Sequence, residues 1–134
     1  MRSLLFVEDN ELLAETAVMA LTDVGLEVRA VRDAESAWAL LEQRPFDAVV
    51  VDVHLADGIS GIELTRRILK HHPELSVVLT TAYETSEVAL PDGVVVLRKP
   101  YLFRELVLAA TGEQVPDLSG AITASDRSDG HRAV

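Results

Sequence analysis

Short apolar runs alternate with helical patterns along most of this chain, and this alternation constrains its fold more than any other feature. Runs rich in β-branched and aliphatic residues predict strands, and apolar residues three and four positions apart predict helices between them. The expected strands cover residues 4–7, 27–31, 46–51, 77–79 and 94–97. Such an order is typical of an α/β domain, in which right-handed crossovers join the strands of one parallel sheet.

The predicted helices carry recognisable end signals. The first is expected to end before Gly25, and the second to begin after Asp33, a residue type that caps helix N-termini. The third is expected over residues 62–71, before Pro73, and the last over 103–110, where apolar residues recur at helical spacing.

Two segments depart from this regular pattern. Between Thr81 and Val94 only residues 84–90 could form a helix, and a Pro-Asp-Gly turn follows them. We therefore expect the fourth helix to be short or absent. Residues 113–134 are rich in Ser, Asp, Gly and Ala and have no apolar periodicity, so we expect one domain over 1–112 and a flexible C-terminal tail.

Composition narrows the classes of function. The chain has 134 residues, of which 22 are acidic and 12 basic, and its formal net charge is −10. This acidic balance argues against nucleic acid or an anionic membrane surface as the main partner. The absence of Cys excludes disulfides, thiolate metal sites and a Cys nucleophile. No apolar run is long enough for a signal peptide or a membrane span, so we expect a cytoplasmic protein.

Polar side chains follow four of the predicted strands at their carboxyl ends. Glu8 and Asp9 follow the first strand, Asp52 the third, Thr81 the fourth and Lys99 the fifth. Because ligands bind at the carboxyl edge of an open parallel sheet, we expect these side chains to meet there. Clustered carboxylates repel one another and favour a cation, and oxygen ligands favour Mg²⁺ where phosphate is handled. Ammonium and hydroxyl groups suit phosphoryl oxygens, so the pattern indicates a phosphoryl group on or beside a carboxylate.

The same residues fall within a series of motifs. In chain order the motifs are LFVEDN at 5–10, VVDVHL at 50–55, GIEL at 61–64, TA at 81–82 and KPY at 99–101. With them the chain resembles the receiver domain of bacterial two-component response regulators, from about residue 4 to about residue 110. The resemblance implies a flavodoxin-like, doubly wound sheet of five parallel strands in the order 2-1-3-4-5.

The resemblance also implies roles for the acidic residues. Asp52 looks like the acceptor of a phosphoryl group, which would make the chain a phosphoprotein carrying an aspartyl phosphate. Glu8 and Asp9 look like the acidic pair that holds the cofactor Mg²⁺. Asp52 itself and the backbone carbonyl of His54 look like its further ligands.

Three more residues match the part of the motif that contacts the phosphoryl group, and a proline follows the last of them. Thr81 looks like the switch hydroxyl, with the backbone of Ala82 beside it, and Lys99 looks like the cation that pairs with a phosphoryl oxygen. Family members carry a cis bond before the proline after this lysine, so the resemblance implies a structural role and a cis bond for Pro100.

The chain departs from the family pattern at several positions. Ala56 stands where proline is usual, and Val96 stands where an aromatic ring commonly couples to the switch hydroxyl. Tyr101 is the nearest ring that could partly replace it. The bulky side chains of His54 and Tyr83 flank the expected path of the hydrolytic water, and we expect them to lengthen the lifetime of the phosphoryl group.

Three functions are compatible with parts of this pattern. The resemblance implies a receiver that takes its phosphoryl group from a sensor histidine kinase or phosphotransfer protein and signals through contacts with an unknown downstream protein. It would be no conventional enzyme, have no DNA-binding output domain and exist as a monomer or weak dimer, whether free-standing, a phosphate sink or a relay intermediate. An aspartate-nucleophile phosphatase would generally want an acid where His54 stands. A phosphorylation-independent interaction module would not need the complete polar set.

No binding role is predicted for one aromatic residue and three basic residues of the second and third helices. Trp38 is expected to pack on one face of the second helix. Arg66, Arg67 and Lys70 are expected to form a solvated face of the third helix, and we do not interpret them as a nucleic-acid patch.

Overall fold

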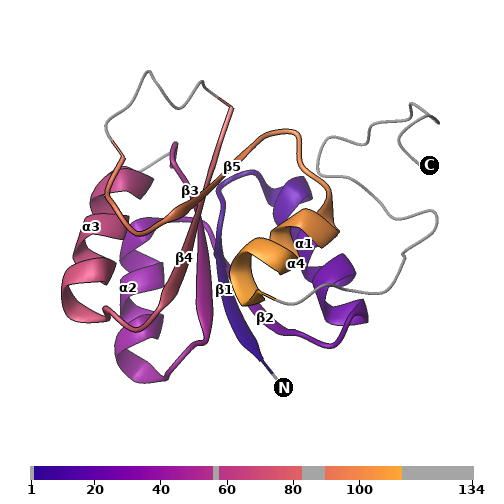
Figure 1. Ribbon diagram of the computed structural model, residues 1–134, viewed down its shortest axis with the longest axis horizontal. Helices are drawn as coiled ribbons and strands as arrows, with labels where there is room; N and C mark the ends of the chain where they lie inside the picture. Colours follow the sequence, from indigo (N-terminus) through magenta and orange to yellow (C-terminus); the bar gives the residue numbers. More distant parts are fainter. Residues whose placement is uncertain (1, 56–57, 83–89, 113–134) are drawn as a thin grey trace.

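The computed structural model describes residues 2–55, 58–82 and 90–112, which form one parallel sheet with helices on both faces (Figure 1). The strands are β1 (Ser3–Val7), β2 (Glu27–Val31), β3 (Ala48–Asp52), β4 (Ser76–Thr81) and β5 (Val95–Arg98). They pair in the order β2-β1-β3-β4-β5, and every pairing is parallel. The predicted α/β fold and the predicted strand order 2-1-3-4-5 are therefore confirmed.

Among the described residues, two helices cover each face of the sheet. The helices of the described residues are α1 (Glu11–Asp23), α2 (Ala34–Gln43), α3 (Gly61–His71) and α4 (Phe103–Thr111). In Figure 1, α1 and α4 lie on one side of the sheet and α2 and α3 on the other. Because both faces are covered, β1 and β3 are buried along their whole length, which explains why their sequences are continuously apolar. The edge strand β2 is instead exposed at Glu27, Arg29 and Ala30.

The sheet separates two hydrophobic cores. Successive side chains of a strand point to opposite faces, so neighbours in sequence enter different cores. Leu5 and Val49 pack towards α2 and α3, whereas Leu4 and Val50 pack towards α1 and α4. The strand sequences thereby supply both cores at once, and the sheet edge between them is left for polar residues.

Side chains at the helix ends explain where the helices begin and end. Asp33 accepts a hydrogen bond from the backbone N–H of Ser36 at 2.7 Å, which confirms the predicted cap of α2. Gly25 follows α1 with φ 97°, a left-handed conformation that glycine adopts without strain. Asn10 and Ser60 cap α1 and α3 in the same way as Asp33.

The start of the third strand differs from the prediction. The strand begins at Ala48, so Phe46 and Asp47 precede it. Phe46 is buried beneath the guanidinium of Arg44, which lies 4.6 Å from the ring centroid. Asp47 accepts a hydrogen bond from the backbone N–H of Ser3 at 2.8 Å, so its carboxylate joins the starts of β1 and β3. The backbone N–H of Asp47 also donates to the carbonyl of Ser3 at 2.9 Å, so hydrogen bonding to β1 begins one residue before the strand.

Some predictions concern residues that the structure does not describe. Residues 84–89 of the predicted short fourth helix and the predicted tail at 113–134 lie outside the described residues, and Leu90 belongs to no helix or strand. Ala56 and Tyr83 also lie outside them. Within the described ranges, the helices are all too short or too polar to cross a bilayer.

Candidate functional site

The carboxyl edge of the sheet collects the predicted polar residues. Glu8 and Asp9 follow β1 directly, Asp52 is the last residue of β3, and Lys99 follows β5. One carboxylate oxygen from each of the three acidic residues lies within 4.8 Å of the others. Glu8 and Asp52 are buried and Asp9 is partly exposed, so the cluster opens to solvent on the side of Asp9.

Lys99 bridges two of these carboxylates. Its Nζ lies 3.1 Å from Oε1 of Glu8 and 3.1 Å from Oδ2 of Asp52. One ammonium cannot neutralise three carboxylates, so the fully ionised cluster keeps an excess of negative charge. This excess is an electrostatic reason for the cluster to bind a further cation.

Burial controls the ionisation of the cluster. Burial of Glu8 and the nearby charge of Asp52 raise the pKa of Glu8 to about 7, against the opposing effect of Lys99. Burial also disfavours the charge of Lys99, but the Asp52 and Glu8 carboxylates outweigh it and raise the pKa of Lys99 above its ordinary value. At neutral pH the lysine is therefore charged, while Glu8 holds its proton more readily than an ordinary glutamate.

Backbone groups orient the two buried carboxylates. The N–H of His54 donates to Oδ1 of Asp52 at 3.1 Å, and the N–H of Asn10 donates to Oε2 of Glu8 at 3.2 Å. In both Glu8 and Asp52, one carboxylate oxygen accepts a hydrogen bond from a backbone N–H and the other accepts one from Lys99. The side chain of His54 is exposed, so it stands at the solvent side of Asp52.

Gly61 supports the position of Asp52 from the start of α3. A Cβ atom at Gly61 would collide with the backbone carbonyl of Asp52, and the Gly61 N–H donates to the carbonyl of Val53 at 3.0 Å. Only glycine allows this close approach of the helix to the strand end. The GIEL motif contains this residue, but the motif did not reveal that its role is to let α3 start against β3.

The predicted switch residues lie on the neighbouring strand ends. Thr81 ends β4 and is fully buried, and Ala82 follows it with an exposed side chain. The Lys99 N–H donates to the carbonyl of Thr81 at 2.7 Å, which holds the end of β5 beside the end of β4. The bond between Lys99 and Pro100 is cis, as the resemblance implied.

Tyr101 lies inside the protein rather than at its surface. Its side chain is buried, and its ring meets the ring of Phe103 edge-on at 6.0 Å. Its hydroxyl has no hydrogen-bond partner among the described residues. Burial and the charges of Glu8 and Asp52 raise the pKa of Tyr101 above its ordinary value, so the phenol stays neutral. Val96, where the family commonly has a ring, is partly buried.

Comparison with known proteins identifies the family. Residues 4–111 match the response regulator receiver domain. The chain is 34% identical over 124 residues to the response regulator protein PilR of Pseudomonas aeruginosa, covering 87% of this chain but 28% of PilR. It is 31% identical over 113 residues to the response regulator receiver protein CpdR of Brucella abortus, covering 80% of this chain and 92% of CpdR.

Solved receiver structures share the fold. A response regulator of Burkholderia pseudomallei, crystallised with a phosphorylated aspartic acid, calcium ion and citrate, is 26% identical with a TM-score of 0.75, covering 83% of this chain and 67% of that one. The response regulator TrrA of Thermotoga maritima, in complex with Mg²⁺-BeF, is 27% identical with a TM-score of 0.68. The match covers 80% of this chain and 94% of TrrA. Metal ions are thus bound in receivers similar to this chain. On its sequence, fold and acidic cluster, the chain belongs to the receiver domain family of two-component response regulators.

Proposed function

We propose that Asp52 accepts a phosphoryl group from a sensor histidine kinase or a phosphotransfer protein, with Mg²⁺ as the cofactor. The observation that carries this proposal is the convergence of three carboxylates within 4.8 Å of one another, with Lys99 bonded to Asp52. A buried aspartate beside a lysine and two more acids is suited to accept a phosphoryl group and to hold the cation that the transfer needs.

The donor set fits a hard divalent cation. Glu8, Asp9 and Asp52 offer only oxygen, and we assign the backbone carbonyl of His54 as a further ligand by analogy with the family. Oxygen ligands and a side open to water suit Mg²⁺, which keeps part of its hydration shell. When bound, Mg²⁺ would neutralise charge on the carboxylates and the phosphoryl oxygens.

Each remaining residue has a distinct task in the transfer. A carboxylate oxygen of Asp52 forms a bond to phosphorus as the bond from phosphorus to the histidine nitrogen of the donor breaks. Lys99 then moves its hydrogen bond from the Asp52 carboxylate to a phosphoryl oxygen. The Thr81 hydroxyl and the Ala82 backbone N–H donate to the other oxygens.

The new charge would produce the signal. A phosphoryl group on Asp52 adds negative charge and acceptor oxygens at the sheet edge, and it draws Thr81 and Lys99 inward. The ends of β4 and β5 follow because Lys99 and Thr81 are joined through their backbones. A downstream protein would recognise the changed surface. The proposed turnover is limited to self-catalysed phosphorylation and autodephosphorylation, and bulk at His54 and Tyr83 slows the latter.

The test is the intact mass of the chain after incubation with a small phosphoryl donor, with and without Mg²⁺. We expect one phosphoryl adduct that requires Mg²⁺ and is absent from Asp52→Asn. Asp47→Asn is the matched control, because Asp47 flanks the other end of the same strand and lies outside the cluster. An adduct that persists in Asp52→Asn, or no adduct from either a small donor or a phosphorylated histidine kinase, would contradict the proposal. The second result would favour a phosphorylation-independent interaction module.

A further inference from the structure

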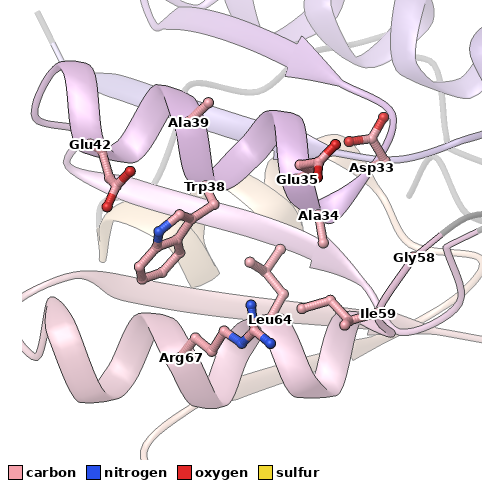
Figure 2. Close-up of a pocket in the computed structure, with 10 residues that line it drawn as sticks. All are labelled: Asp33, Ala34, Glu35, Trp38, Ala39, Glu42, Gly58, Ile59, Leu64 and Arg67. Carbon is pink, nitrogen blue, oxygen red and sulfur yellow. The ribbon is translucent and has the colours of Figure 1, made fainter.

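A cavity of about 570 Å³ lies between α2 and α3. Its apolar lining comes from Trp38 on α2, Leu64 on α3 and Ile59 in the loop before α3 (Figure 2). Trp38 is only partly buried, and its ring meets the ring of His71 edge-on at 5.5 Å. A large aromatic side chain therefore reaches the surface between two helices, away from the three clustered carboxylates, whose residues do not line this cavity.

Charges of opposite sign flank Trp38. The carboxylates of Glu35 and Glu42 line the α2 side of the cavity, and the Arg67 guanidinium lines the α3 side (Figure 2). A second hollow of about 490 Å³ adjoins Trp38 over α3. Its lining residues are Trp38, Glu63, Arg66, Arg67, Lys70 and His71. The surface is thus acidic along α2, apolar in the middle and mainly basic along α3.

The one acid on the basic side does not neutralise it. Glu63 lies 3.7 Å from Arg66 and 3.8 Å from Arg67, and all three side chains are about half exposed. Exposed ion pairs at such distances contribute little. Both arginines therefore remain available for a partner, and Lys70 adds a third cation one turn further along the helix.

We propose that this face binds a second copy of the chain about a two-fold axis that runs along the groove, parallel to α2 and α3. Both helices join parallel strands of one sheet, so they run side by side in the same direction. Rotation about such an axis places α2 of each copy opposite α3 of the other. The acidic side chains of each copy then face the basic side chains of the other, and the two-fold axis repeats this pairing. The two Trp38 side chains meet at the centre, where aromatic residues contribute most to binding.

Charge complementarity favours a second copy over an unrelated partner. A surface that is acidic on one side of an apolar centre and basic on the other is complementary to itself under this rotation. The net charge of −10 on each copy opposes association at long range, so the local pairing produces a weak dimer. This inference does not depend on phosphorylation, and the two proposals can fail separately.

The test is sedimentation velocity of the full chain between about 5 and 500 μM, the range of weak association. One variant, Glu35→Arg/Glu42→Arg, makes both sides of the groove basic. The other, Arg67→Glu/Lys70→Glu, makes both sides acidic. We expect the wild type to dimerise, each variant alone to dimerise at least about tenfold more weakly, and an equimolar mixture of the two to recover the dimer as a heterodimer.

The matched control reverses two acids on a different helix. Glu11 and Glu15 are exposed on α1, so Glu11→Arg/Glu15→Arg changes net charge by the same amount as Glu35→Arg/Glu42→Arg without touching the groove. This control should dimerise at least as well as the wild type. A monomeric wild type would overturn the proposal and leave the groove to a different protein. Self-association that neither variant weakens, or a mixture that stays monomeric, would also overturn it.

Discussion

At the carboxyl edge, Lys99 lies 3.1 Å from a glutamate whose side chain is 2% exposed, whereas on α3 Arg66 lies 3.7 Å from a glutamate whose side chain is 45% exposed. The two pairs have the same chemistry and different surroundings. At the edge, burial and crowding raise the pKa of Glu8 to about 7, so ionisation responds to any new charge nearby. On α3, water screens the charges and leaves them free to meet a partner. The difference between the carboxyl-edge cluster and the charged surface of α3 therefore comes from burial and not from the number of charges.

The largest effect on stability is expected where the backbone approaches the buried edge. Gly61→Ala should lower the free energy of unfolding by about 3 kcal/mol, because the added Cβ collides with the carbonyl of Asp52. It should also slow phosphorylation. Gly25→Ala is the control, since Gly25 has positive φ but open space around its Cβ position, and should cost only about 1 kcal/mol. Urea unfolding measures both, and equal costs would contradict the proposed close packing.

Removing one cation from the buried cluster and one from the exposed cluster on α3 tests directly whether burial distinguishes them. Lys99→Met leaves two buried carboxylates without their partner, so we expect a loss of about 2–3 kcal/mol at pH 8 without divalent cations. Arg67→Met removes an exposed cation and should change stability by less than about 0.5 kcal/mol. Similar losses in the two variants would show that burial does not distinguish the clusters.

The pH dependence of stability should distinguish the two glutamates. The folded chain keeps a proton on Glu8 up to pH of about 7, whereas the unfolded chain releases it near 4.5, so stability should fall as pH rises between these values. The decrease should be about 1–3 kcal/mol without divalent cations and absent from Glu8→Gln. Mg²⁺ should weaken it by favouring the ionised form. Glu63→Gln, the exposed control, should keep the full decrease in urea unfolding measured from pH 4.5 to 8.

The smallest effects are expected from buried hydroxyls that lack a partner. Tyr101→Phe removes such a hydroxyl near the acidic edge and should stabilise the fold by about 1 kcal/mol. Thr65→Val removes a buried one from within α3 and should stabilise the fold by about 0.5 kcal/mol. Thermal unfolding at fixed pH measures both, with Thr16→Val as an exposed-hydroxyl control. Destabilisation by either substitution would mean that the hydroxyl has a partner.

Much of the fold could be predicted because strands and helix ends depend on patterns of neighbouring residues. The continuous apolar runs of β1 and β3 and the cap at Asp33 each depend on neighbours a few residues away. The start of β3 was predicted two residues too early, because the apolar pattern includes Phe46, which precedes the strand, and Asp47 bonds through its side chain to Ser3, 44 positions away. Long-range pairing of this kind leaves no local signal.

The sequence by itself determined the fold class, the strand order through its family motifs, and the polar residues found at the carboxyl ends of four strands. Only the tertiary structure decided that Lys99 bonds to both Glu8 and Asp52 and that Gly61 must lack a side chain. It also brought the acidic side of α2 and the basic side of α3 together around Trp38. The physical reason is that residue type and spacing encode local conformation, whereas burial, distance and pKa depend on groups that meet only when the sheet assembles.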